Sequence, residues 1–164
     1  MYVKTIYHSP LGAMSLVATD KGLRGAWFEG QKYFERGLRE EPVLGSHPIL
    51  DQTSLLLDAY FSGEVVDFST LLLETIGTEF QENVWTLLKE IPHGQTTSYG
   101  QLAQQLGVCS GQAIGGAVGR NPYAIIVPCH RVLNQKGQLT GYAGGLDKKI
   151  WLLTHENPQF EVKK

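Results

Sequence analysis

The spacing of apolar residues changes near Gly77, and this change limits the folds open to the chain more than any other feature. Before it, turn signals at Ser9-Pro10-Leu11-Gly12 and Asp20-Lys21-Gly22 separate three strand-like segments, residues 2–8, 13–19 and 23–28. Two hairpin signals so close together predict antiparallel strands. After Gly77 the apolar residues follow the period of a helix. The order predicts an α+β protein with two small domains, residues 1–76 and 77–164.

The rest of the first domain contains one predicted helix and one extended connection. Apolar residues recur at helical spacing between residues 47 and 62, and Gly63 ends the pattern. Residues 63–76 then lead to the second domain, and a strand-like section at residues 68–73 could return to the first sheet.

The second domain begins with a predicted helix from Thr78 that ends at Pro92-His93-Gly94. Ser98 suits the N-cap of a helix over 99–106 that Gly107 closes, and a short helix over about 111–118 follows. Two helices joined in this way predict a helix-turn-helix, with a strand at 124–127 and the region 132–142 as its wing. Glycines in the second helix permit close approach to a ligand backbone.

Charge is distributed unevenly along the chain. The net charge is -2, but residues 1–76 carry six basic and ten acidic side chains, whereas residues 77–164 carry eight and six. Between His93 and Thr154 Asp147 is the one acid, beside five basic residues, Arg120, Arg131, Lys136, Lys148 and Lys149. This local excess predicts a modest phosphate-facing surface, with merely solvated charges as the alternative.

Composition indicates a soluble protein of the cytoplasm. No basic segment followed by an apolar one opens the chain, and no apolar run approaches the roughly 20 residues of a membrane span. Cys109 and Cys129 are the two cysteines, and in a reducing compartment they are expected to be free thiols. The chain has no CxxC or HxxxH spacing, so we expect no metal.

The run Pro128-Cys129-His130-Arg131-Val132 is typical of an activated nucleophile. It follows the apolar residues Ile125-Ile126-Val127, and thiol chemistry requires a thiolate that a nearby base can generate. Consecutive side chains of a strand point to opposite faces, so a turn at Pro128 or a bridging water would have to connect Cys129 with His130. The alternative is an inert buried thiol beside a packed histidine.

Several further blocks occur in order around this run: Gly77-Thr78-Glu79-Phe80-Gln81, Ile91-Pro92-His93-Gly94-Gln95-Thr96, Ser98-Tyr99, Asn121-Pro122, Thr140-Gly141-Tyr142-Ala143-Gly144-Gly145, and Leu152-Leu153-Thr154-His155-Glu156. With them, residues 77–156 resemble the O6-alkylguanine-DNA alkyltransferase family in its bacterial constitutive form. The first domain resembles the family's ribonuclease-H-like domain more weakly, through its two turns. The resemblance implies a ribonuclease-H-like scaffold domain followed by a catalytic winged helix-turn-helix domain.

The resemblance also implies a reaction, repair of DNA by transfer of the alkyl group of a flipped O6-alkylguanine to the protein's own cysteine. Cys129 is then the nucleophile, His130 its base through a water, and Glu156 the carboxylate that orients the imidazole. Tyr99 faces the guanine ring, and Asn121 ties the helix-turn-helix to the active-site strand. The thioether product cannot be reversed by protonation, so each molecule acts once and without a cofactor.

Further positions are implied to bind the substrate and the DNA. The substrate residues are Val132, Tyr142, Ala143 and Lys149. The DNA residues are Gln112, Ala113, Gly115, Arg120 and Arg131. Gln112 stands where the family has an arginine that fills the gap left by the flipped base, and glutamine lacks its charge and planar fork.

The implied partner is double-stranded DNA carrying O6-alkylguanine, bound by a monomer with no obligate protein partner. One alternative is a non-enzymatic lesion sensor of the alkyltransferase-like type, but those proteins carry tryptophan at the position of Cys129. A Cys-His-Glu hydrolase and a plain transcription factor are the others. The sequence leaves open the preferred alkyl group, activity on O4-alkylthymine, cooperativity on DNA, and the roles of Cys109 and the first domain.

Overall fold

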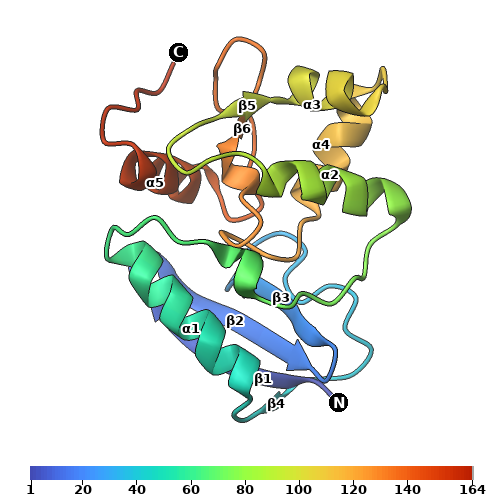
Figure 1. Ribbon diagram of the computed structural model, residues 1–164, viewed down its shortest axis with the longest axis vertical. Coiled ribbons are helices and arrows are strands. Elements are labelled where there is room, and N and C mark those ends of the chain that lie inside the picture. The colour runs from blue at the N-terminus through green and yellow to red at the C-terminus, as the bar shows by residue number, and fades with distance from the viewer. Residues whose placement is uncertain (164) are drawn as a thin grey trace. The chain divides into compact units, whose positions relative to one another are not determined.

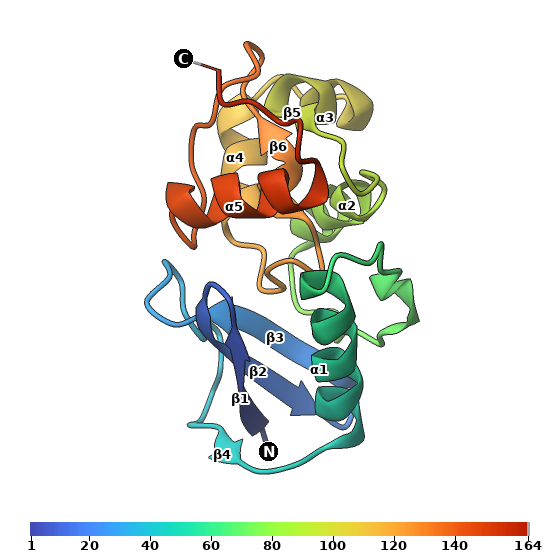
Figure 2. The same cartoon turned by 90° about the vertical axis from the view of Figure 1, so that its left-hand side faces the viewer.

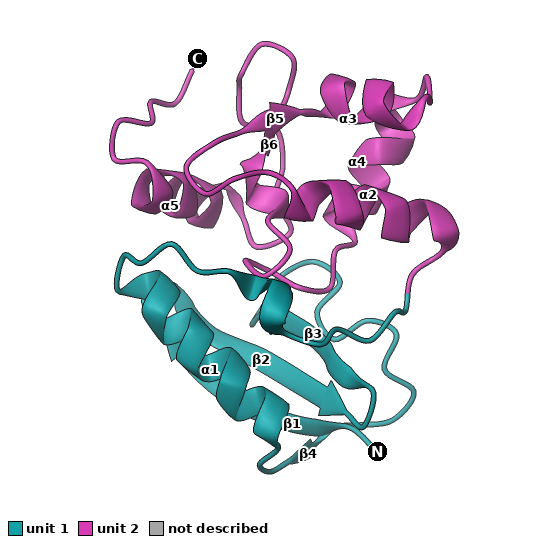
Figure 3. Ribbon diagram, in the orientation of Figure 1, with its two compact units in different colours: residues 1–76 teal, residues 77–164 magenta. Residues whose placement is uncertain are grey.

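The computed structural model describes residues 1–163, and the chain divides into two compact units, Met1–Ile76 and Gly77–Lys164 (Figure 3). The first unit is a sheet with one long helix, and the second is mainly helical. This arrangement confirms the α+β class expected from the change in apolar spacing.

The sheet of the first unit is a meander of three antiparallel strands. They are β1 (Val3–Ser9), β2 (Gly12–Thr19) and β3 (Gly22–Phe28), and the three predicted strands are therefore confirmed. Gly12 and Gly22 lie in the two turns with φ of 110° and 133°, a backbone conformation that other residues rarely adopt. The short β4 (Val43–Leu44), which was not predicted, pairs in parallel with β1 and gives the order β3-β2-β1-β4.

Helix α1 (Pro48–Phe61) covers one face of this sheet (Figures 1 and 2). His47 caps it, since its Nδ1 accepts a hydrogen bond from the Ile49 amide at 3.1 Å, and proline suits the first helical position. Leu50, Leu57 and Tyr60 point into the core. The helix predicted over 47–62 is confirmed.

The prediction of a strand over residues 68–73 is wrong. Residues Phe68–Thr70 make a short 3-10 helix, η1, which Asp67 caps through the Ser69 amide. The chain nevertheless returns to β3, because the Leu23 amide donates to the Leu72 carbonyl at 2.8 Å. A single bridge at Leu73 results, rather than a strand.

Three helices of the second unit begin within one residue of the predicted starts, and the predicted cap Ser98 is confirmed. They are α2 (Glu79–Lys89), α3 (Tyr99–Leu106) and α4 (Gly111–Gly119), capped by the hydroxyls of Thr78, Ser98 and Ser110. Gly107 ends α3 in the left-handed conformation, with φ of 68°. The indole of Trp85 in α2 donates to the Ala117 carbonyl of α4 at 2.8 Å, which joins α2 to the helix-turn-helix.

Two elements of this unit were not predicted. Helix α5 (Leu146–Glu156) begins at Gly145 without a side-chain cap, and a two-stranded parallel ladder pairs β5 (Thr97–Ser98) with β6 (Val132–Leu133). The ladder lies between α5 and the group formed by α2, α3 and α4 (Figures 1 and 2). It brings the start of the helix-turn-helix next to the residues that follow Cys129.

The predicted strand at 124–127 is wrong. These residues form tight turns instead, with the Ile126 amide donating to the Ala124 carbonyl at 2.8 Å and the Val127 amide donating to the Tyr123 carbonyl at 2.9 Å. Their backbone groups are thus used locally and not in a ladder. Ile125 is buried at a φ of 71°, an unusual conformation for a β-branched residue.

Candidate active site and nucleic-acid interface

Cys129 opens a short 3-10 helix, η2 (Cys129–Arg131), rather than ending a strand. Successive side chains of a 3-10 helix are about 120° apart, so the strand geometry that would separate Cys129 from His130 does not apply. The thiol is buried, and burial raises its pKa. A hydrogen bond from Asn121 and the charge of Lys149 act in the opposite direction but do not cancel the effect of burial.

His130 and Glu156 form a buried pair within the second unit. The Nε2 atom of His130 lies 2.6 Å from Oε2 of Glu156, and the two side chains are 0% and 1% exposed. Burial alone would raise the pKa of Glu156, but hydrogen bonds from His130 and Arg131 and the charge of Arg131 hold it well below the ordinary value. The carboxylate is therefore ionised and can only accept.

This ionisation assigns the proton of the imidazole. Since the carboxylate accepts, Nε2 carries the hydrogen, and Nδ1 presents a lone pair. Burial lowers the pKa of His130 despite the carboxylate beside it, so the ring is neutral near pH 7. Nδ1 is buried and has no hydrogen-bond partner within residues 1–163. The ring is thus a base with one available nitrogen.

Arg131 is part of this buried network and not of the protein surface. Its Nε and Nη2 atoms donate to Oε1 and Oε2 of Glu156 at 2.7 Å and 3.0 Å, and its Nη1 donates to the Ile91 carbonyl at 2.6 Å. A guanidinium engaged on three sides and buried cannot also face a phosphate. The sequence-based assignment of Arg131 to DNA binding is therefore corrected: Arg131 holds the carboxylate that holds His130.

Asn121 lies directly after α4 and fixes the turn that precedes Cys129. Its Nδ2 donates to the carbonyls of Val127 at 2.8 Å and Tyr123 at 3.3 Å, and its Oδ1 accepts from the Tyr123 amide at 3.0 Å. These bonds hold the strained conformation of Ile125, which costs about 1–3 kcal/mol. The end of α4 and the entry to the nucleophile are thereby joined through one amide.

Lys149 of α5 is fully buried, and its Nζ donates to the Gly141 carbonyl at 2.9 Å. Burial lowers its pKa to about 8, although a thiolate at Cys129 would raise it. Tyr142 and Ala143 are half-buried in the loop that this bond anchors, and Val132 is buried in β6. Of these four substrate-binding candidates, Lys149 acts on Cys129 through its charge, Val132 directly follows η2, and Tyr142 and Ala143 follow the Gly141 that Lys149 holds.

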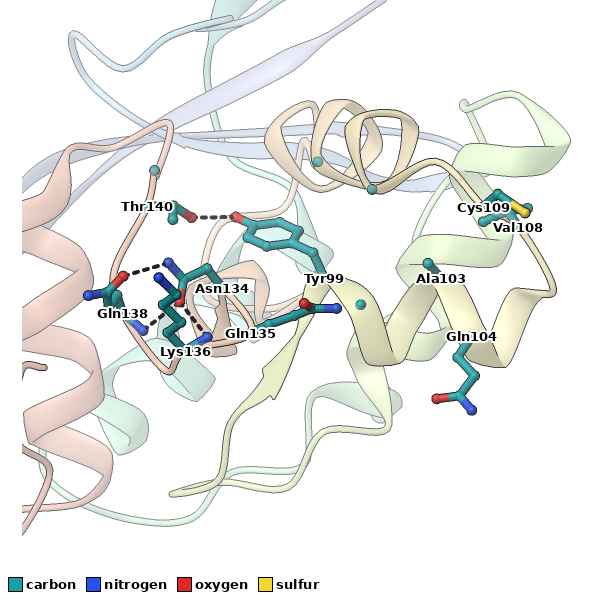
Figure 4. Close-up of a pocket in the computed structure, with 14 residues that line it drawn as sticks. Tyr99, Ala103, Gln104, Val108, Cys109, Asn134, Gln135, Lys136, Gln138 and Thr140 are labelled. Carbon is teal, nitrogen blue, oxygen red and sulfur yellow. Dashed lines mark hydrogen bonds between the residues drawn. The ribbon is translucent and has the colours of Figure 1, made fainter.

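A groove of about 930 Å³ opens between α3, the start of α4 and the loop 134–141 (Figure 4). Tyr99 lines it, and the Thr140 hydroxyl donates to the Tyr99 hydroxyl at 3.5 Å across it. Gly141, whose carbonyl receives Lys149, lines the same groove. The groove therefore reaches the loop that Lys149 anchors.

The exposed surface of α4 carries the other predicted DNA-binding residues. Gln112 and Ala113 are exposed, and Gly115 is half-buried. Arg120 is exposed, and its Nη1 also donates to the Gly116 carbonyl of the same helix at 3.1 Å. Because Arg131 and Lys149 are buried, the predicted basic surface is reduced to Arg120, Lys136 and Lys148.

Residues 1–163 contain neither a metal-binding cluster nor a membrane-spanning helix. No cluster of three or more histidine, cysteine, aspartate or glutamate side chains able to hold a metal ion occurs among them. No helix in this part of the chain is long and apolar enough to cross a membrane.

Comparison with family models assigns both halves of the chain. Residues 79–158 match the model described as 6-O-methylguanine DNA methyltransferase, DNA binding domain, and residues 2–75 match its ribonuclease-like domain. The chain belongs to the 6-O-methylguanine DNA methyltransferase family.

Relatives in this family are similar over nearly the whole chain. The methylated-DNA–protein-cysteine methyltransferase of Methanosarcina acetivorans is 43% identical over 92% of this chain and 96% of its own. That of Shigella flexneri is 52% identical over 90% of this chain and 91% of its own. A crystal structure of Mycobacterium tuberculosis O6-methylguanine methyltransferase superposes with a TM-score of 0.84 at 36% identity, over 99% and 97% of the two chains.

A further structure, Mycobacterium tuberculosis OGT in complex with DNA, superposes with a TM-score of 0.83 at 37% identity, over 96% of this chain and 92% of that chain.

Some parts of this 6-O-methylguanine DNA methyltransferase site were not found from the sequence. The Ile91 carbonyl, which accepts from Arg131, belongs to the block Ile91-Pro92-His93-Gly94, which was recognised as a helix end and as part of the family resemblance but was given no role in the site. Burial lowers the pKa of His93, and the charges of Glu156 and Arg131 also act on it. Gln135 packs over Gly100, where an added Cβ would lie 2.3 Å from its Nε2.

Proposed function

We propose that this chain repairs DNA by moving the alkyl group of O6-alkylguanine to the sulfur of Cys129, once per molecule. Family membership and the methylated-DNA–protein-cysteine methyltransferases among its relatives support this reaction. One observation of the site supports it most: the buried Cys129 directly precedes His130 in η2, and the imidazole has its Nε2 held by an ionised carboxylate while its Nδ1 has no hydrogen-bond partner among residues 1–163.

The proposed transfer needs no cofactor, because every bond that breaks is matched by one that forms. The thiol at rest is protonated, because burial raises its pKa, and a water between the groups carries its proton to Nδ1 of His130. The sulfur then bonds to the alkyl carbon as the carbon–O6 bond breaks. Tyr99 donates a hydrogen bond or a proton to the leaving guanine, and the proton from the thiol restores neutrality.

Glu156 and Arg131 act by positioning other groups of the site. Glu156 keeps the proton on Nε2 and stabilises the imidazolium that forms during transfer, and Arg131 keeps the carboxylate in place through two hydrogen bonds. Asn121 fixes the turn before the nucleophile. Arg131 and Asn121 are therefore positioning residues in this proposal.

The substrate is a base rotated out of the duplex, since a stacked O6 substituent is out of reach of the sulfur. Tyr142 and the backbone of Ala143 enclose the alkyl group and O6, and the carbonyls of Cys129 and Val132 accept from the exocyclic amine. Lys149 keeps their loop in place through Gly141.

Helix α4 provides the surface for the duplex. Gly111 and Gly115 each weaken a helix by about 1 kcal/mol relative to alanine, yet a Cβ at either position would meet no protein atom within 4 Å in the described structure. Packing inside the protein does not explain these glycines. Close approach of a DNA backbone does, with Gln112, Ala113 and Arg120 around them.

The non-enzymatic sensor is the second candidate, and the cysteine at position 129 disfavours it. A sensor would bind the lesion without forming a bond to sulfur. We also propose that the protein is a monomer, works in the cytoplasm and needs no obligate protein partner.

Intact mass spectrometry after incubation with a duplex carrying O6-methylguanine tests the reaction. We expect one added methyl group on the native chain, located in the peptide that contains Cys129, and none on Cys129→Ser. The matched control is Cys109→Ser, which removes the exposed thiol and should still gain the methyl group. Product beyond one equivalent of protein would contradict the single-use mechanism.

A further inference from the structure

The last described residues of the chain pair with the loop between Leu133 and Thr140. Gln138 and Lys163 form a parallel bridge. Gly137 lies beneath the Lys163 side chain, since a Cβ built on Gly137 would lie 3.1 Å from Cδ and 3.2 Å from Nζ of Lys163. With a φ of 77°, Gly137 also has a conformation that favours glycine. The lysine therefore lies across a turn that only a glycine leaves open.

This turn is held by its own hydrogen bonds. Oδ1 of Asn134 accepts from the amides of Lys136 at 2.9 Å and Gln138 at 2.8 Å, and the Gly137 amide donates to the Asn134 carbonyl at 2.9 Å. Lys136 is exposed on the same turn. The backbone that carries Lys136 and receives Lys163 is therefore fixed before any ligand arrives.

The two lysines line a depression of about 480 Å³ at the start of α3. Thr96, Thr97 and Ser98 line it as well, and no acidic side chain does so among the described residues. Neither lysine forms an ion pair with any residue from 1 to 163. Two uncompensated ammonium groups in a depression without acidic side chains favour an anion with several oxygens.

The depression continues the larger groove. Both are lined by Gly100, Gln104 and the turn residues 134–136, and the contact of Gln135 with Gly100 marks their common border. Figure 4 shows Gln135 and Lys136 at the edge of the groove. An extended ligand in the groove would thus reach the two lysines.

We propose that Lys136 and Lys163 together hold one backbone phosphate of the DNA, so that the C-terminal tail completes the nucleic-acid interface. The inference rests on the proposed function and extends its DNA contact from α4 to the loop and the tail. Phosphate contacts of this kind set the register of a protein on the duplex without reading sequence.

The test measures binding to an unmodified duplex over a range of salt concentrations. Lys163→Ala and Lys136→Ala should each weaken binding about fivefold at low salt, independently of DNA sequence, and lower the salt slope by about one. Lys21→Ala, which removes an exposed lysine of the first unit, is the matched control and should change neither. Gly137→Ala keeps both charges, strains a residue with a φ of 77° and shifts the Lys163 side chain slightly, so it should weaken binding less than Lys163→Ala does.

Transfer from free O6-benzylguanine separates this inference from the proposed function. The lysine variants should alkylate Cys129 from the free base at the native rate, because the phosphate contact is absent. Equal affinity and equal salt slope for the native chain and both lysine variants would overturn the phosphate site. Failure of the proposed function would appear differently, as a native chain that gains no alkyl group.

Discussion

The interiors of the two units differ in what they bury. In the described part of the first unit, the buried polar residues are Ser15, Arg24 and Thr53, whereas those of the second are Asn121, His130, Arg131, Lys149 and Glu156. Ser15 and Thr53 are satisfied as hydroxyl donors, to Glu35 and the Ile49 carbonyl. Arg24 is the one buried charge of the described first unit, whereas the second unit buries a group of four charged or titratable side chains, which are costly unless they are paired and hydrogen-bonded. The first interior serves stability, and the second holds the chemistry.

The largest expected effect is on the transfer rate and follows removal of the buried base His130 from the second unit. His130→Gln should slow transfer from free O6-benzylguanine at neutral pH by about 10²- to 10⁴-fold. The native rate should be flat between the lowered pKa of His130 and the raised pKa of Cys129. The variant depends on the thiolate that forms unaided, so its rate should rise with pH into the alkaline range. Single-turnover rates across pH measure both effects.

A variant with the same flat pH profile as the native chain would show that His130 is not the base. Circular dichroism of the variant controls for folding.

The second effect is the stability cost of breaking the buried ion pair. Glu156→Gln leaves the guanidinium of Arg131 buried without its counter-charge, and the free energy of unfolding should fall by about 3–5 kcal/mol. The native pair also sets a pH dependence. Because the folded pKa of Glu156 is depressed, its contribution is complete above the unfolded pKa and is lost as pH falls through the folded one.

Urea unfolding of both chains across acidic pH measures this contribution. The difference between native and Glu156→Gln should shrink as pH falls, and a constant difference would contradict the assigned ionisation.

The smallest effect is confined to stability and concerns the first unit. Leu57→Ala removes a fully buried side chain of α1 and should cost about 2–5 kcal/mol by urea unfolding, with an unchanged transfer rate in the folded protein. Leu55→Ala, on the exposed side of the same helix, is the control and should stay within about 0.5 kcal/mol. A slower transfer by the folded Leu57→Ala variant would contradict the inference that the interior of the first unit serves stability alone.

Elements with local signals could be predicted from the sequence. Ser98 and Gly107 bound α3 at both ends, since a hydroxyl cap and a left-handed glycine act on the adjacent turn alone. Helix α5 lacks such a signal, because Gly145 offers no capping side chain, and its start was not predicted. The segment 124–127 is apolar like a strand, and its own backbone bonds together with those of the Asn121 side chain make it a turn.

The candidate site divides in the same way. The family resemblance named Cys129, His130 and Glu156, and the structure brings the latter two to 2.6 Å. It gave Arg131 the wrong surroundings, because the acceptors of this residue, Glu156 and the Ile91 carbonyl, are separated from it by 25 and 40 positions. A charge count along the chain does not distinguish a buried cation from an exposed one.

The carboxylate of Glu156 lies in the last turn of α5, 26 positions after His130. In the proposed mechanism, the cysteine therefore depends on a helix that is synthesised after it. A chain truncated before α5 would contain the thiol without the carboxylate that orients its base, and it should transfer the alkyl group slowly or not at all.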